Sequence, residues 1–164
     1  MSSSSTLEVL MYQIGQLFLL PVLGLVALLF LYSLYVLGGF AVQAWQRRDR
    51  QGLRGYPLLR YAQQHAAVTD DELDLHAHKL LEPERLASRV APMLGLVGTM
   101  IPMGPALKSL SDGNLAQVSG SLTVAFSAVI LALIAASITY WVANVRRRWL
   151  AEEIVRLQKG RAQQ

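Results

Sequence analysis

The chain of 164 residues is 53% hydrophobic and only 16% charged, whereas a typical soluble domain has about 25% charged residues. A formal net charge of +4 would suit a nucleic-acid partner, but the cations gather in particular segments. The sequence contains no cysteine, which excludes a disulfide framework, a thiolate metal site and a cysteine nucleophile. We therefore do not expect a soluble globular enzyme.

A first membrane-spanning helix is expected at residues 17–44, after a short N-terminus of residues 1–16. No acidic or basic side chain occurs from Leu17 to Val42, and at about 1.5 Å per residue this stretch is long enough to cross a hydrocarbon core of about 30 Å. Pro21 lies near the start of the stretch, where a helix tolerates proline. A cleaved signal peptide is the alternative, but the stretch is too long for one and no Lys or Arg precedes it.

Two further apolar segments, residues 90–108 and 118–145, are separated by a polar turn at 109–117. The first of the two is short and contains three prolines, so a re-entrant segment is the alternative to a second span. The second is long and ends abruptly at three arginines, residues 146–148. Three spans are the simplest count.

The distribution of cations predicts the orientation of these spans. Residues 1–16 and the turn at 109–117 contain no Lys or Arg, whereas residues 45–89 contain eight and residues 146–164 contain six. Cytoplasmic loops are enriched in Lys and Arg. The N-terminus and the turn are therefore expected outside, and the two cation-rich segments in the cytoplasm.

The cytoplasmic segments are expected to be helical. Thr69 and Glu72 are spaced as a capping box, which predicts a helix from there to about Leu81. Pro83 suits the first turn of a new helix that continues into the second span. Apolar residues recur at helical spacing in the tail, residues 146–164, which is therefore expected to continue the third span.

Two pairs of side chains in these segments have simple interpretations. Trp45 and Trp149 are expected at the inner membrane–water interface, where amphipathic rings prefer to lie. His76 and His78 are two residues apart and would point about 200° apart on a helix, and no cysteine accompanies them. They are interpreted as solvated helix surface, and neither a metal nor a cofactor is expected.

The spans carry the functional signal. On the second span, Thr99 shares one arc of the helix with four small residues, which are Gly95, Gly98, Pro102 and Ala106. On the third span, three hydroxyl residues recur at a spacing of four: Ser119, Thr123 and Ser127. Ordinary packing of membrane helices is one interpretation of these faces. The other is that they line a narrow polar path or seat a partner helix.

One string at the start of the second span is distinctive. Residues 91–99 read APMLGLVGT, and residues 125–129 of the third span read AFSAV. This combination resembles the ExbB/TolQ/MotA proton channel family over residues 80–150, and the three-span order is similar to ExbB and TolQ rather than to four-span MotA. The resemblance implies an all-α membrane protein with three transmembrane helices and cytoplasmic helical extensions. It also implies a ring of five copies around two single-span helices of an ExbD/TolR-type partner, in which proton flow drives motion.

The resemblance also suggests roles for individual residues. Thr99 resembles the family's hydroxyl residue that faces the partner's carboxylate, and Ser127 matches the position of a threonine on the third span. Pro102 and Pro105 depart from the pattern of ExbB and TolQ in the outer half of the second span.

The charges support a partner independently. All eleven Asp and Glu residues lie outside the apolar stretches, whereas a proton relay normally uses an ionisable group inside the membrane. Another chain, one with a membrane-embedded Asp, would have to supply that group. Lys108 is the only cation outside the cytoplasmic segments. It is interpreted either as a charge at the pore mouth or as an anchor whose long stem reaches the outer headgroups.

These observations favour the ring subunit of a motor driven by the proton-motive force, in the cytoplasmic membrane of a bacterium or archaeon, that energises transport or an envelope process. The alternative is a non-conducting scaffold that only holds a partner membrane protein. An enzyme is not expected, because the sequence shows no nucleophile–base pair, and residues 95–99 lack the Lys and the spacing of a phosphate-binding loop.

Overall fold

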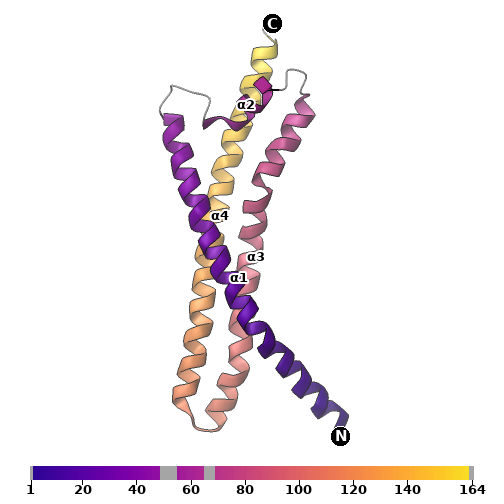
Figure 1. The fold of residues 1–164 in the computed structure, drawn as a ribbon, viewed down its shortest axis with the longest axis vertical. Coiled ribbons are helices and arrows are strands. Elements are labelled where there is room, and N and C mark those ends of the chain that lie inside the picture. Colours follow the sequence, from indigo (N-terminus) through magenta and orange to yellow (C-terminus); the bar gives the residue numbers. More distant parts are fainter. Residues whose placement is uncertain (1, 49–54, 65–68, 163–164) are drawn as a thin grey trace. The chain divides into compact units, whose positions relative to one another are not determined.

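The computed structural model of the chain describes residues 2–48, 55–64 and 69–162. The elements in these ranges are α-helices: α1 (Ser2–Arg48), α2 (Pro57–Gln64), α3 (Asp70–Ser111) and α4 (Leu115–Ala162). Three of them, α1, α3 and α4, are long and apolar enough to cross a membrane, and Figure 1 shows them as the dominant elements. The predicted all-helical fold with three candidate spans is confirmed.

Helix α1 is longer than the predicted span at 17–44. It begins at Ser2, so Pro21 lies inside the helix rather than near its start. Within a helix, proline removes one backbone hydrogen bond. Membrane helices tolerate proline because neighbouring groups can satisfy the freed carbonyl.

Helix α3 begins at the predicted capping box. The Thr69 N–H donates to Glu72 Oε2 over 3.1 Å, and the Glu72 N–H donates to Thr69 Oγ1 over 3.4 Å. The prediction that Pro83 starts a new helix is wrong, because α3 runs through it without a break to Ser111. Proline removes one backbone hydrogen bond from the helix, and the helical turns on both sides of Pro83 offset this loss. Ending the helix and starting another at Pro83 would require a second nucleation step, which is unfavourable. The unbroken helix has no re-entrant turn.

The connection from α3 to α4 is shorter than the predicted turn at 109–117. Three residues, 112–114, separate the two helices. Gly113 has φ = 74°, a left-handed conformation that glycine adopts without strain. Asn114 caps α4, since its Oδ1 accepts the Gln117 N–H over 3.2 Å. Helix α4 then continues through the arginines to Ala162, as predicted for the tail.

The chain forms two compact units, and each long helix contributes to both. The apolar unit comprises Met1–Tyr32 and Arg89–Ala136, and the charged unit comprises Ser33–Ser88 and Ser137–Gln164. The apolar unit contains the predicted second span and most of the third. The charged unit contains most of the predicted cytoplasmic residues, some of which, 49–54 and 65–68, lie outside the described ranges.

In the apolar unit, glycines let α3 approach α4 closely. A Cβ added at Gly95 would lie 2.7 Å from Ala132 Cβ, and one added at Gly98 would lie 3.2 Å from Ala128 Cβ. Alanines and two α1 side chains extend this contact in a cluster of Ala91, Ala135, Ala136, Leu29 and Phe30. Small residues allow membrane helices to approach so closely, which gives van der Waals contact in place of a hydrophobic driving force.

The charged unit has its own small apolar core. Leu58 of α2 packs with Ala77 and Leu81 of α3 and with Leu150 of α4, and Ile154 packs against this cluster. On this part of α3, Leu73, Ala77 and Leu81 are buried, whereas Leu80 is 38% exposed. Helix α2, which the sequence pattern did not predict, completes the core.

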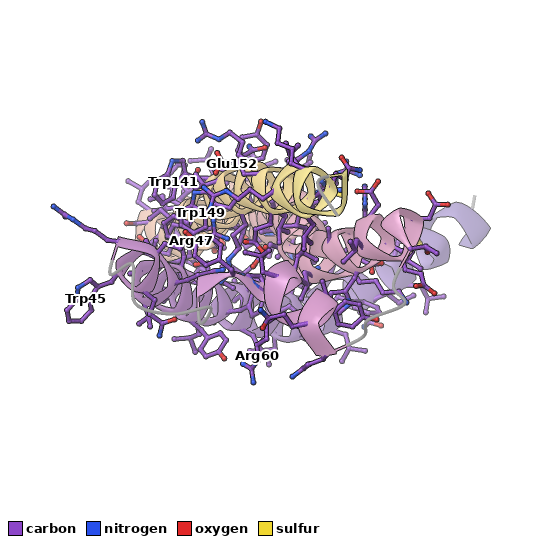
Figure 2. The ribbon with its side chains drawn as sticks, turned by 90° about the horizontal axis from the view of Figure 1, so that it is seen from above. Trp45, Arg47, Arg60, Trp141, Trp149 and Glu152 are labelled. Carbon is purple, nitrogen blue, oxygen red and sulfur yellow. The ribbon has the colours of Figure 1, made fainter. Side chains whose placement is uncertain are left out.

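A buried carboxylate joins three helices of the charged unit. Glu153 of α4 is 1% exposed and forms an ion pair with Arg47 of α1. It also accepts the backbone N–H of Leu58 in α2 over 2.9 Å. The guanidinium of Arg47 lies over the Trp149 ring, 4.4 Å from its centre, and Figure 2 shows these two side chains together. One side chain therefore anchors both α1 and α2 to α4.

The aromatic side chains of this region divide into two groups. Trp149 stacks on Phe40 with ring centres 5.0 Å apart, so it packs within the charged unit. Trp45 is 75% exposed and points outward in Figure 2. Of the two tryptophans predicted at the membrane interface, Trp45 has the exposure that an interfacial anchor requires.

Adding one methyl group at Gly95 is expected to destabilise the protein. The new Cβ would lie too close to Ala132, so α3 and α4 must separate, at a cost of about 1–3 kcal/mol. The matched control is Gly120→Ala on α4, where an added Cβ meets nothing within 4 Å. The higher helix propensity of alanine should stabilise this variant by up to about 1 kcal/mol. In thermal unfolding measured in mild detergent, only Gly95→Ala should have a lower midpoint temperature than the parent protein. Equal midpoints for the two variants would contradict the close approach.

Removing the carboxylate of Glu153 is expected to loosen the charged unit. Glu153→Ala leaves Arg47 and the Leu58 N–H without their shared acceptor, and breaking a buried ion pair costs about 3–5 kcal/mol. Glu152→Ala removes the same charge from an exposed neighbour and should change stability by no more than about 0.5 kcal/mol. Hydrogen exchange at residues 57–64 reports the difference. Unchanged protection of α2 in Glu153→Ala would contradict this role.

Candidate functional site

Three hydroxyl residues form an exposed row on α4. Ser119, Thr123 and Ser127 are each exposed and lie one helical turn apart. Thr123 Oγ1 donates to the Ser119 carbonyl over 2.9 Å, and Ser127 Oγ donates to the Thr123 carbonyl over 2.8 Å. We call these three residues the hydroxyl face. Because the hydroxyls of Thr123 and Ser127 donate their hydrogen bonds to carbonyls of α4, their oxygen lone pairs remain able to accept a hydrogen bond from a group outside the chain.

Thr99 lies on α3 beside the glycines that contact α4. Its side chain is half-buried, and its Oγ1 donates to the Leu96 carbonyl over 2.7 Å. Like the hydroxyl face, Thr99 therefore offers acceptor lone pairs and uses its proton internally. Within the part of the chain that the structure describes, no hydrogen bond joins Thr99 to the hydroxyl face.

The four small residues of α3 are buried inside the chain. They are Gly95, Gly98, Pro102 and Ala106. The first two contact α4 of the same chain, and a Cβ added at Gly98 would also lie 3.8 Å from Val22 Cγ1 of α1. This part of the face is therefore used for packing within the chain. Its contact with a helix of a partner protein stays a prediction.

Lys108 lies in the last turn of α3 and is exposed. A cation is favourable at the C-terminal end of a helix, where it interacts with the helix dipole. Asp112 is four residues further on, but Lys108 forms no ion pair with it or with any other described residue. Its charge is available to lipid headgroups or to another chain.

The charged unit holds two buried carboxyls, and both lie outside the predicted spans. Glu84 is 2% exposed and forms an ion pair with Arg146, as Glu153 does with Arg47. The pKa of Glu84 is raised above its ordinary value of 4.5, because the effect of burial is larger than the opposing effect of the nearby Arg146 guanidinium. Burial likewise raises the pKa of Glu153, against the lowering effects of the Leu58 N–H and Arg47. Each ion pair therefore offsets a desolvation cost and fixes how the helices pack.

The sequence did not reveal these ion pairs. It showed that carboxylates avoid the spans, but it gave no reason to join Glu84 to Arg146, which is 62 residues away. One signal in the sequence could have suggested a paired arginine. Arg146, the first of three consecutive arginines, directly follows the apolar stretch of α4 and is partly buried. The next two, Arg147 and Arg148, are exposed.

The two histidines differ in their surroundings. His78 is exposed, and its Nδ1 lies 2.9 Å from the Asp74 carbonyl oxygen, which fits the predicted solvated surface. His76 is half-buried and stacks on Tyr61 of α2, with ring centres 4.2 Å apart, which the prediction of plain surface missed. Among the described residues, no group of three His, Asp or Glu side chains is placed to hold a metal ion.

These features define a multi-pass membrane protein whose apolar helices carry hydroxyl acceptors. The chain belongs to the MotA/TolQ/ExbB proton channel family, since the sequence profile of that family matches residues 65–159, more than half of the chain. The match includes Thr99, the hydroxyl face and Lys108, while α1 precedes it. No curated protein and no solved structure matches the chain.

A change of charge at Lys108 separates its two predicted roles. If the stem anchors the end of α3, Lys108→Gln and Lys108→Glu should change ion flux through reconstituted vesicles by less than about twofold, because surface charge is screened. At the mouth of a pore, charge reversal should alter the flux strongly, since attraction of cations would replace repulsion. We expect the anchoring result. Flux is measured at low ionic strength with the partner chain present, and a large effect of Lys108→Glu alone would contradict anchoring.

Proposed function

We propose that this chain is the ring-forming subunit of a motor driven by the proton-motive force in the cytoplasmic membrane of a bacterium or archaeon. Copies of the chain, five by resemblance, surround two single-span helices of an ExbD/TolR-type partner. The motor energises transport or an envelope process. The observation that carries this proposal is the family match over residues 65–159, which contains the hydroxyl residues of both α3 and α4.

The distribution of charges suggests which chain carries the proton and which chain lines its path. The apolar stretches of this chain contain no carboxylate, and hydroxyls do not titrate near neutral pH. The partner therefore supplies a membrane-embedded Asp that takes up and releases the proton. Thr99 and Ser127 accept hydrogen bonds from that carboxyl group or from water beside it, and Thr123 and Ser119 extend the polar path along α4. The chain itself is proposed to be neither an enzyme nor a cofactor carrier.

The proposed topology follows the positive-inside rule. The N-terminus and the turn between α3 and α4 face outward, while residues 45–89 and 146–164 face the cytoplasm. In this orientation Lys108 lies near the outer surface, and Arg146 lies where the third span enters the cytoplasm. The extensions of α3 and α4 are then the cytoplasmic stalk of the ring.

A non-conducting scaffold is the second candidate. The observation that favours it is the packing of Gly95 and Gly98 against α4, together with hydroxyl protons that are already bonded to backbone carbonyls. A scaffold needs only these contacts. Loss of the hydroxyls would then leave its function unchanged, which makes the two candidates distinguishable.

Removing the hydroxyls tests conduction directly. Thr99→Val keeps the shape of the side chain nearly constant, and Ser127→Ala removes only the oxygen. A hydrogen bond to a charged group contributes about 1.5–3 kcal/mol, so each variant should reduce proton-dependent flux by at least about tenfold. Ser111→Ala, at the exposed end of α3, is the matched control. Flux is measured in vesicles that contain the chain and its partner.

Expression and oligomer size should be the same in all three variants, because none of the changes affects the contacts of Gly95 and Gly98. Full flux in the Thr99→Val, Ser127→Ala double variant would favour the scaffold and contradict the proposed proton path.

Assembly provides a separate test. Native mass spectrometry in mild detergent should show a pentamer, and crosslinks between neighbouring copies should place Thr99 and Ser127 toward the centre of the ring. A monomer or dimer under the same conditions, with crosslinks only at positions far from the hydroxyl face, would contradict the ring.

A further inference from the structure

The charged unit contains a cavity of about 160 Å³ that none of the proposed functions uses. Its walls come from all four helices, and they combine three polar side chains, Gln43, Arg47 and Arg146, with apolar ones that include Leu80 and Trp149. A cavity of this composition suits a ligand with an anionic head and an apolar continuation.

The cavity lies where two apolar stretches end. Gln43 directly follows Val42, the last residue of the first apolar stretch, and Arg146 directly follows Val145, the last residue of the third. In a membrane that these helices span, this level corresponds to the lipid headgroups. Basic pockets between transmembrane helices at this level are known to bind anionic headgroups.

Arg47 is held rigidly in the wall of the cavity. Its guanidinium lies 4.6 Å from the centre of the Tyr56 ring and 4.4 Å from that of Trp149. Its Nε donates to the Gly55 carbonyl over 2.7 Å, and one terminal nitrogen pairs with Glu153. These hydrogen bonds use two of the three nitrogens, which leaves the donors of the third for a ligand.

Arg146 has a donor that the described residues leave unsatisfied. One terminal nitrogen pairs with Glu84 Oε1, whereas the Nε of Arg146 and the Oε2 of Glu84 are both buried and have no hydrogen-bond partner in the described part of the chain. Arg146 lines the cavity together with Arg47. Two guanidinium groups on one cavity match the several acceptor oxygens of a phosphate group.

We propose that this cavity binds the phosphodiester headgroup of an anionic membrane lipid. The phosphate oxygens accept from Arg47 and Arg146, and the glycerol carbons contact Leu80 and Trp149. At about 160 Å³ the cavity is smaller than the roughly 300–1,000 Å³ of sites for drug-sized ligands, so it takes the headgroup while the acyl chains lie along the outside of the helices. The site depends on the protein's place in the membrane and not on proton conduction.

Native mass spectrometry of the full-length protein, purified in mild detergent, tests this site. The protein is titrated with dioleoyl-phosphatidylglycerol, with dioleoylglycerol, which lacks the phosphate, and with inorganic phosphate, which lacks the tail. We expect retained adducts of phosphatidylglycerol only. Stronger binding of dioleoylglycerol would indicate a purely apolar site, and equal binding of inorganic phosphate would indicate a site for free anions. Either result would overturn the proposal.

Variants connect the adduct to this cavity. Arg146→Gln combined with Glu84→Gln removes the buried ion pair without leaving a lone charge, and it should weaken phosphatidylglycerol binding at least about tenfold. Leu80→Trp fills the cavity from a partly exposed position and changes no charge, so it should weaken binding similarly and serves if the first variant does not fold. Arg148→Gln removes an exposed arginine from the same helix and should stay within about twofold. An equal loss in Arg148→Gln, or undiminished binding in Leu80→Trp, would overturn the proposal.

Discussion

Hydrocarbon does not solvate charge, and this constraint governs the whole chain. A single carboxylate or cation at the centre of a membrane costs about 2.5–3.5 kcal/mol even by the most lenient scale. The sequence meets the constraint by placing every Asp and Glu outside three apolar stretches. Two consequences follow. The apolar unit is held together by close contact of small residues, and the apolar stretches offer no carboxylate on which a proton could cross.

The same three long helices are held together by different kinds of contact in the two units. In the apolar unit, Gly95 and Gly98 let α3 approach α4, which leaves the hydroxyls of α4 on an exposed face. The charged unit instead contains a small apolar core and two buried ion pairs. Glu153 fixes α1 and α2, and Glu84 pairs with Arg146 beside the cavity. The small residues of α3 therefore pack within the chain, while the hydroxyl face of α4 stays exposed.

The sequence predicted what depends on local pattern. The three long helices, the capping box at Thr69 and the continuation of α4 through its arginines follow from composition and spacing. The break expected at Pro83 was wrong, because the cost of one lost hydrogen bond is small against a long helix that is already formed. Helix α2 and the pair of Glu84 with Arg146 were missed, since both depend on contacts between distant residues. The roles of Thr99 and Ser127 came from family resemblance and stay predictions.

The central claim is that this chain offers a path for protons but no group to carry them. Proton flux through vesicles containing this chain alone, compared with vesicles containing the chain and the proposed single-span partner, tests it most directly. The account predicts that the chain alone gives the flux of protein-free vesicles and that adding the partner raises it. Equal flux with and without the partner, above that of protein-free vesicles, would contradict the claim, because the proton would then cross on this chain's own residues.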